Sequence, residues 1–299
     1  MLKRNIVFYL PAQNKRDFPY ISEKSADRHR EFISYFPSSV QFYLAIHEEQ
    51  YIWINAFNPQ FIRIWDTWKK NTRDNIEADL ILWMSAKVES EKIYHNKIKD
   101  FCRDKTQIES IFPEYSFKSE ICNSYSEILK KHKNINSEIK VYKPCFGSRA
   151  LGIVISDSLP SKSQLTWEYP YLIQEFMDTS AGFQWYPGIH DFRVIILNGK
   201  ITGSFLRVAP DWVMTANVAT WAKIIDFYWK VPEQIQRVIN QVESYIAPLY
   251  PERYYSIDTC IGKNGEVKIF ELNSNPMLST PSIIEWLAQH IIKDILKIS

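Results

Sequence analysis

Two carboxylates and an amide in the C-terminal part of the chain could bind a hard cation. Glu271 and Asn273 stand two residues apart at the end of a β-like run, residues 267–277. Because side chains in a strand alternate between faces, these two must point the same way. Asp258 lies in the preceding β-like arm, and turn-forming residues 262–265 join the two arms. Such oxygen donors suit magnesium, although a solvated strand face is the ordinary alternative.

The register predicted for this hairpin puts all three side chains on one face. The loop is taken as symmetric about Lys263 and Asn264. Asp258 then stands opposite Ile269 and diagonal to Glu271. Two acidic groups on one face repel unless a cation is present, so this register favours a metal site. The other face collects three apolar side chains that we expect to be buried, Ile257, Phe270 and Leu272.

A lysine followed by a glycine-containing loop could bind phosphate groups. Lys143 ends a β-like run, and an apolar Ile-Val-Ile strand begins at residue 153. Backbone N–H groups in such a loop can surround phosphate oxygens while the lysine neutralises their charge. The loop matches neither the Walker A pattern nor the dinucleotide-binding fingerprint, and a plain hairpin turn explains it about as well. Its polar and glycine residues are Gly147, Ser148, Arg149 and Gly152.

A second hairpin, residues 191–207, carries charged side chains that the same site could use. Two β-rich arms flank Asn198-Gly199, the preferred pair for a two-residue type I′ turn. Strict pairing about that turn puts Asp191 and Arg193 on the face opposite Arg207. Either a β-bulge restores them to one face, or only Arg207 faces the site. Asp191 and Arg193 are then equally well explained as site residues or as a structural ion pair.

Strand and helix patterns alternate along the rest of the chain. We expect a charged, exposed stretch at 14–30. The strand patterns cover residues 5–10, 40–46, 50–54, 80–84, 139–142 and 168–177. The helix patterns cover residues 92–105, 124–131, 232–249 and 283–296. Mixed patterns of this kind predict an α+β architecture.

Composition limits the class of protein. The 299 residues are 45% hydrophobic and 23% charged with a net charge of +2, which gives no electrostatic reason to expect a nucleic acid or a membrane as the main partner. The four cysteines form no CxxC or Cys/His cluster, which favours reduced thiols over structural zinc. No apolar run is long enough for a membrane helix. We therefore expect a soluble, cytoplasmic protein.

Taken in order, these motifs resemble a known superfamily. The set consists of Lys143-Pro144, Gly147-Ser148, Gln174-Glu175-Phe176, Asp191-Phe192-Arg193, Arg207, Asn217, Asp258 and Glu271-Leu272-Asn273. It resembles the ATP-grasp superfamily and, within it, the ligases that join amino acids to a carboxylate. The resemblance implies two α+β subdomains that grip ATP, preceded by a small α/β N-terminal domain. The expected divisions are 1–90 for the N-terminal domain, 91–170 for the central subdomain and 171–299 for the C-terminal subdomain.

The resemblance also implies roles for the nucleotide site. Lys143 would contact the nucleotide phosphates under a mobile loop, residues 147–153, that includes Arg149. Gln174, Glu175 and Phe176 would lie at the adenine edge, where the backbone makes the hydrogen bonds. Lys97 matches a lysine that often opens the central subdomain, although an exposed helix lysine is equally consistent with the sequence.

For the chemistry, the resemblance implies two magnesium ions that bridge the triphosphate, held by Asp258, Glu271 and Asn273. Arg207 would stabilise the transferring phosphoryl group, with Arg193 as a second catalytic candidate. Asp191 and Asn217 would contact phosphate or metal. The chain departs from related ligases at Ala150, where they often have a central glycine, and in the additional residues 177–190.

Three functions are consistent with these residues. The favoured one is an ATP- and magnesium-dependent ligase that joins a carboxylate to an amine, an amino acid or a peptide, through an acyl phosphate. The alternatives are an ATP-grasp small-molecule kinase and a nucleotide-binding module without catalysis. The aromatic stretch 211–229 could line the acceptor pocket or belong to the core, and packing is favoured. The stretch 51–68 could form a homodimer surface or pack within the monomer, and again packing is favoured.

Overall fold

The computed structural model divides the chain into two compact units. The first comprises Met1–Asn96 and Met277–Ser299, and the second comprises Lys97–Pro276. The structure describes residues 4–11, 23–48, 51–56, 69–72, 80–82, 98–146, 151–166, 168–181, 183, 186–211, 213–216, 222–274, 276 and 281–297. The divisions that the sequence predicts at residues 90 and 170 remain a prediction. Within the described residues, no helix is long and apolar enough to span a membrane.

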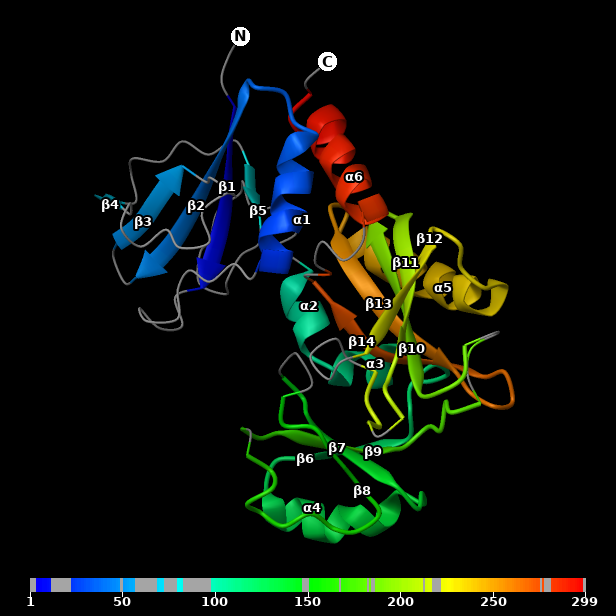
Figure 1. Ribbon diagram of the computed structural model, residues 1–299. Helices are drawn as coiled ribbons and strands as arrows, with labels where there is room; N and C mark the ends of the chain where they lie inside the picture. Colours follow the sequence, from blue (N-terminus) through cyan, green and yellow to red (C-terminus); the bar gives the residue numbers. More distant parts are fainter. Residues whose placement is uncertain are drawn as a thin grey trace. The chain divides into compact units, whose positions relative to one another are not determined.

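The first unit contains a five-stranded sheet in the order β4-β3-β2-β1-β5. Strand β1 runs parallel to β2 and β5, whereas β2, β3 and β4 pair antiparallel. Helices α1 and α6 pack together in this unit (Figure 1). A π-helical turn, Ile291–Ile295, extends α6. The elements are β1 (Arg4–Pro11), α1 (Glu23–Ser34), β2 (Val40–Glu48), β3 (Tyr51–Ala56), β4 (Lys69–Thr72), β5 (Leu80–Leu82) and α6 (Pro281–His290).

Helix α1 lies where the sequence predicted only a charged, exposed stretch. Among its charged residues, the helix contains one apolar contact that the sequence pattern does not reveal. Phe32 is fully buried and packs against Phe36 and Phe42. Packing of one apolar stripe is enough to hold such a helix, whatever the charge of its other faces.

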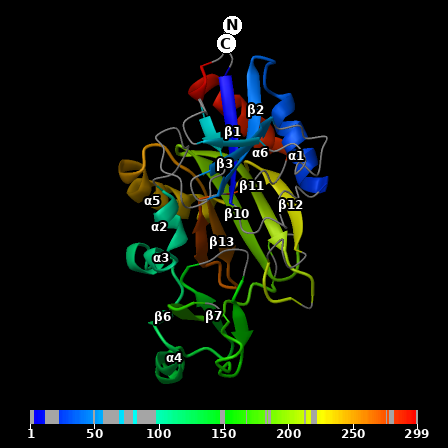
Figure 2. The ribbon, with the colours of Figure 1, turned by 90° about the vertical axis from the view of Figure 1, so that its left-hand side faces the viewer.

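The second unit begins with a four-stranded antiparallel sheet in the order β6-β9-β7-β8. Helix α4 lies along one face of this sheet, as both views show (Figures 1 and 2). Ser124 caps α4, since its hydroxyl accepts a hydrogen bond from the Glu127 N–H. The elements are α2 (Lys99–Arg103), α3 (Thr106–Ile111), β6 (Ser119–Cys122), α4 (Tyr125–Lys131), β7 (Lys140–Pro144), β8 (Val154–Ser156) and β9 (Tyr171–Glu175).

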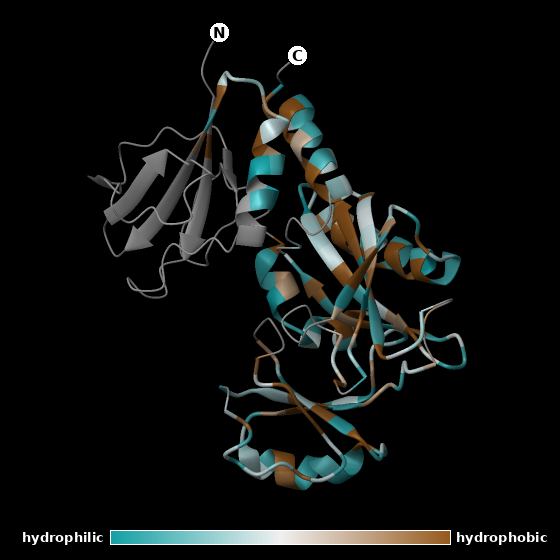
Figure 3. Ribbon diagram, in the orientation of Figure 1, coloured by the Kyte–Doolittle hydropathy of each residue, from teal (hydrophilic) through white to brown (hydrophobic). Residues whose placement is uncertain are grey.

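A five-stranded antiparallel sheet, in the order β12-β11-β10-β13-β14, forms the rest of the second unit. Helix α5 buries its apolar stripe, and Figure 3 shows hydrophobic residues in the strands and in the helix beside them. The elements are β10 (His190–Leu197), β11 (Lys200–Val208), β12 (Lys223–Tyr228), α5 (Glu233–Leu249), β13 (Tyr254–Ile261) and β14 (Val267–Asn273). Strand β12 shows that part of the aromatic stretch 211–229 belongs to the sheet, and Phe227 packs on the core there.

The β10–β11 hairpin has the predicted turn and also the bulge that the sequence left open as one of two alternatives. Asn198 and Gly199 both have positive φ, 48° and 83°, as a type I′ turn requires. The register then shifts between Ile195 and Ile196, so that Asp191 pairs with Arg207. Because paired residues share a face, the bulge brings both charged side chains to the same side of the sheet.

The β13–β14 hairpin also contains a bulge, and the register predicted for it is wrong. Asp258 pairs with Glu271, and beyond the shift Thr259 pairs with Ile269. Phe270 is the additional residue, and it is only partly buried rather than part of the core. It stacks on Phe117, with ring centroids 5.2 Å apart. The prediction that Phe270 is buried with Ile257 and Leu272 is therefore wrong, because the bulge turns its side chain out of the alternating pattern.

Candidate functional site

The strand register concentrates four charged side chains on one face of the five-stranded sheet. Arg193 on β10 pairs with Asp258 on β13, as Asp191 pairs with Arg207. Nε and Nη2 of Arg193 donate to the two Asp258 oxygens, both at 2.6 Å. Nε and Nη2 of Arg207 donate to the two Asp191 oxygens, both at 2.5 Å. Arg207 Nη2 also donates to Asp258 Oδ2 at 2.7 Å, so the four side chains form one continuous network.

Burial makes the electrostatics of this network strong. Asp258 is 1% exposed and Arg207 is 4% exposed. Burial alone would raise the pKa of Asp258, but the two guanidinium groups hold it at about 2. Burial and repulsion from Asp258 raise the pKa of Asp191 to about 7, although Arg207 opposes this. Burial opposes the charge of Arg207, yet the two carboxylates raise its pKa further. Asp258 is thus firmly ionised, and Arg207 is held charged in a place with little water.

Glu271 and Asn273 extend the network along β14. Asn273 Nδ2 donates to Asp258 Oδ2 at 3.2 Å and to Glu271 Oε1 at 3.1 Å. The structure therefore brings together the three side chains that the sequence predicts as metal ligands. Glu271 is half-buried and lines a pocket, with Oε2 making no hydrogen bond to any described residue.

Lys143 approaches the same pocket from the four-stranded sheet. Its side chain comes from β7 and is 6% exposed. Among the described residues, its only hydrogen bond runs from Nζ to the carbonyl oxygen of Phe270, at 3.4 Å. Burial and the nearby Lys105 lower the pKa of Lys143 to about 8. An ammonium group with three donors and one long hydrogen bond is poorly satisfied, which is the condition of a group that binds an anion.

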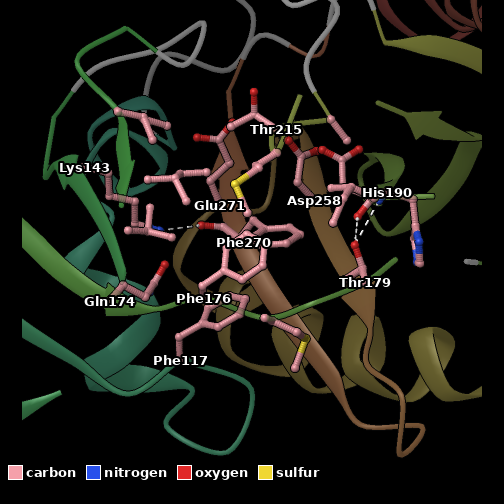
Figure 4. A pocket seen from close by; sticks show the side chains of 18 of the residues that line it. Phe117, Lys143, Gln174, Phe176, Thr179, His190, Thr215, Asp258, Phe270 and Glu271 are labelled. Atoms are coloured by element: carbon pink, nitrogen blue, oxygen red, sulfur yellow. Dashed lines mark hydrogen bonds between the residues drawn. The ribbon is translucent and has the colours of Figure 1, made fainter. Parts of the chain in front are cut away.

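The pocket between the two sheets combines apolar and charged walls. Figure 4 shows Lys143 and Gln174 on one side, Asp258 on the other, and Glu271 with Phe270 between them. The apolar lining includes Phe117, Val141, Ile153, Ile155 and Phe270. A largely apolar cavity with a few convergent polar groups is the usual form of a small-molecule site.

The adenine-edge residues that the sequence predicts lie in this lining. Gln174 and Glu175 end β9, Phe176 follows the strand, and all three border the pocket. The Glu175 and Phe176 N–H groups are already bonded, to the carbonyl oxygens of Lys118 and Ile139. Glu175 Oε1 also accepts from the Lys118 N–H, at 2.9 Å. The N–H groups of Glu175 and Phe176 are therefore not available to a ligand in this arrangement.

Other predicted site residues lie apart from the pocket or outside the described residues. Arg193 does not line the pocket and stands behind Asp258. Gly152 is described and has a φ of 74°, a conformation that suits glycine, next to the lining residue Ile153. Lys97, Gly147, Ser148, Arg149 and Asn217 fall outside the described residues, as does part of the stretch 51–68.

The pocket also contains residues that the sequence did not single out. Thr179 borders it and is tied to His190, whose N–H donates to Thr179 Oγ1 at 2.9 Å (Figure 4). Lys105 also lines the pocket, and its charge helps to lower the pKa of Lys143. Met214 and Thr215 come from the loop after β11, and although they belong to the stretch 211–229 that could line a pocket, neither is one of its aromatic residues. None of these has a spacing or motif that marks it, since each reaches the pocket only through the tertiary fold.

The cluster of Asp258, Glu271 and Asn273 has the oxygen donors that magnesium prefers. No three His, Cys, Asp or Glu side chains among the described residues are grouped to hold a metal ion, so this cluster depends on its amide. Asn273 Nδ2 lies within hydrogen-bond distance of both carboxylates, at a position that favours positive charge. Magnesium is commonly bound by one or two carboxylates together with substrate phosphates. The donor set therefore fits a magnesium ion that is shared with a phosphate ligand.

Comparisons with known proteins show the fold. The D-Ala:D-Ser ligase VanG from Enterococcus faecalis superposes with a TM-score of 0.67 at 10% identity, over 99% of each chain. The ATP-grasp ligase PsnB, in complex with a minimal precursor, gives 0.56 at 12% identity over 97% of this chain and 99% of that one. This chain has the ATP-grasp fold.

A further solved structure, the D-alanyl-alanine synthetase A of Vibrio cholerae, gives a TM-score of 0.62 at 9% identity over 99% of each chain. No family model and no curated protein sequence matches this chain. At these identities the likeness concerns the fold, which confirms the α+β, ATP-grasp architecture expected from the sequence. The chemistry of the site is a separate question.

Proposed function

We propose that the protein is an ATP-dependent ligase that activates a carboxylate as an acyl phosphate and passes it to an amine. The observation that carries the proposal is the convergence of Lys143, Arg207 and Glu271 on one pocket of an ATP-grasp fold. The solved structures of the same fold include a D-Ala:D-Ser ligase and a D-alanyl-alanine synthetase, both of which join amino acids.

The nucleotide would occupy the pocket between the two sheets. The purine would lie against the apolar lining, near Phe270 and Ile155, beside the end of β9. The phosphates would then extend toward Lys143, whose ammonium group has only one long hydrogen bond among the described residues. An ammonium group in this setting gains charge-assisted hydrogen bonds when a phosphate binds.

Magnesium would sit at the β14 end of the pocket. Glu271 offers a carboxylate on the pocket wall, and Asn273 stands beside it. When bound, the ion neutralises phosphate charge and fixes the orientation of the triphosphate. Glu271 and Asn273 would hold the ion at the pocket that Arg207 also lines.

Arg207 would act on the transferring group. Its Nε and Nη2 are engaged by Asp191 and Asp258, which leaves Nη1 without a partner among the described residues. The two carboxylates thus fix the plane of the guanidinium group before any ligand binds. Pre-organised positive charge of this kind stabilises the charge that develops during phosphoryl transfer.

The proposed reaction has two steps, formation of an acyl phosphate and transfer of the acyl group to the amine. A substrate carboxylate attacks the γ-phosphorus, the bond to the β–γ bridging oxygen breaks, and ADP leaves. The amine then attacks the acyl carbon, the acyl–oxygen bond breaks, and inorganic phosphate leaves as the amine loses a proton. Lys143 and Arg207 face the phosphate groups in both steps, so they serve positioning and charge neutralisation rather than covalent catalysis.

The test is ADP release screened against pairs of carboxylates and amines, with free amino acids and short peptides as both partners. A ligase releases ADP and inorganic phosphate in equal amounts only when both substrates are present. A kinase instead leaves the phosphate on its product, and a binding module releases no ADP. Glu252→Gln, at an exposed position, serves as the control for Glu271→Gln, which we expect to abolish turnover.

A further inference from the structure

The three side chains of the predicted metal cluster are not equivalent. Asp258 Oδ1 accepts from Arg193 Nε, and Oδ2 accepts from Arg193, Arg207 and Asn273. A carboxylate has about four lone-pair positions in all. On Oδ2, the oxygen that the Asn273 amide links to Glu271, the Arg193 and Arg207 donors at 2.6 and 2.7 Å already match the two lone pairs. Oδ1 accepts one donor, Arg193 Nε, at 2.6 Å.

The charges nearby also make Asp258 different from Glu271. Two guanidinium groups contact Asp258, and with 1% exposure there is little water to screen them. A divalent ion on the same oxygen would lie next to both, at a strong electrostatic cost. Glu271 contacts no guanidinium group among the described residues, and its Oε1 accepts only the amide of Asn273.

We propose that Glu271 and Asn273 bind a single magnesium ion and that Asp258 is a positioning residue that holds Arg207 in the site. The magnesium part rests on the proposed function, whereas the role of Asp258 as the anchor of two arginines stands on the contacts themselves. This differs from the pair of ions that the sequence resemblance implies. It follows from the register, because Arg193 pairs with Asp258 in the regular β10–β13 ladder and the bulge in β11 brings Arg207 to the same face.

The side-chain amide of Asn273 suits the site both without and with a magnesium ion. Its nitrogen donates to the two carboxylates in this structure. A half-turn of the amide exchanges nitrogen and oxygen without other movement, because the two ends have nearly the same shape. The oxygen would then face the ion beside Glu271, and phosphate oxygens and water would complete an octahedral shell.

The metal test measures how many Mn²⁺ ions bind to protein that is saturated with the non-hydrolysable analogue AMPPNP. The electron paramagnetic resonance signal gives the concentration of free Mn²⁺. We expect one Mn²⁺ per protein–AMPPNP complex. Glu271→Gln should weaken Mn²⁺ binding at least about 10-fold, and Asp258→Asn should leave it nearly unchanged at saturating analogue. Two ions per wild-type complex would overturn the proposal, and this measurement needs no variant to fold.

Thermal unfolding without metal or nucleotide tests the anchoring role. Asp258→Asn leaves buried arginines short of a carboxylate and should lower the melting temperature by roughly 10 °C. Glu271→Gln is the matched carboxylate-to-amide change and should shift it little, as should Glu252→Gln at an exposed position. Equal shifts for Asp258→Asn and Glu271→Gln would contradict the assignment. If AMPPNP does not bind at all, the proposed function and the magnesium site are both wrong. The difference in melting temperature between Asp258→Asn and Glu271→Gln still decides the role of Asp258.

Discussion

The two sheets that border the pocket differ in how they hold their charges. On the five-stranded sheet, Arg193, Arg207, Asp191 and Asp258 neutralise one another at 2.5 to 2.7 Å before any ligand binds. On the four-stranded sheet, Lys143 is buried with a single 3.4 Å hydrogen bond among the described residues. The first sheet therefore supplies fixed geometry, and the second supplies a charge that a ligand can satisfy. Changes on the two sides should have different consequences.

The largest effect is expected on the pre-organised side. Arg207→Gln removes the positive charge that Asp191 and Asp258 orient, and we expect kcat to fall about 10³-fold. The ADP-release assay measures this loss. Arg237→Gln is the matched control, since Arg237 is exposed and pairs with Glu233 on the surface of α5. A rate within the range of that control would show that Arg207 takes no part in phosphoryl transfer.

On the four-stranded sheet, replacing Lys143 should mainly affect the affinity for the nucleotide. Lys143→Met removes the buried ammonium group and should weaken AMPPNP binding about 10- to 100-fold, the value of a charge-assisted hydrogen bond or two. Isothermal titration calorimetry measures it, with Lys162→Met at an exposed loop position as the control. An unaltered dissociation constant would place the phosphates away from Lys143.

The pH dependence of binding should also report on Lys143. Its pKa is lowered to about 8, first by burial, and a bound phosphate favours the charged form and raises the pKa again. Below pH 8 the ammonium group is already charged and affinity should be level. As pH rises above 8, binding requires uptake of a proton, so affinity should fall by up to about 10-fold per pH unit. Lys143→Arg, which stays charged, should remove this dependence from the calorimetric series.

The smallest effect is expected where the two sheets meet. Phe117→Leu removes the stacked contact with Phe270 and should cost about 0.5–1.5 kcal/mol of stability. Denaturant unfolding measures the loss in the free energy of unfolding. A loss of similar size in the free energy of nucleotide binding would show that the same contact shapes the pocket. Ile121→Ala, at a more exposed position on β6, provides the comparison.

The sequence predicts the larger features of this molecule well. The Asn198-Gly199 hairpin, the helices 124–131 and 232–249, and the ATP-grasp fold all agree with the structure. Each of these depends on local chemistry or on the order of motifs along the chain. Helix α1 was missed, because a single buried phenylalanine among charged residues gives almost no periodic signal.

The detailed geometry of the site could not be predicted, because two bulges decide it. An additional residue in β11 pairs Asp191 with Arg207, and one in β14 pairs Asp258 with Glu271. Turn symmetry alone gave the wrong partner for Asp258 and left the face of Asp191 open. A bulge shifts the pairing by one residue and leaves little trace in the pattern of residue types. The contact of Asp258 with Arg207 follows from the shift in β11, whereas its contact with Arg193 lies in the regular β10–β13 ladder.

The most direct test of the central claim is the path of a carboxylate oxygen. The substrate pair found by the ADP-release screen is supplied with ¹⁸O in the carboxylate, and the released phosphate is analysed by mass spectrometry. If the acid is activated as an acyl phosphate and then joined to the amine, one ¹⁸O atom enters inorganic phosphate in each turnover. Inorganic phosphate without the label, or a label that stays with a phosphorylated product, would contradict the ligase mechanism.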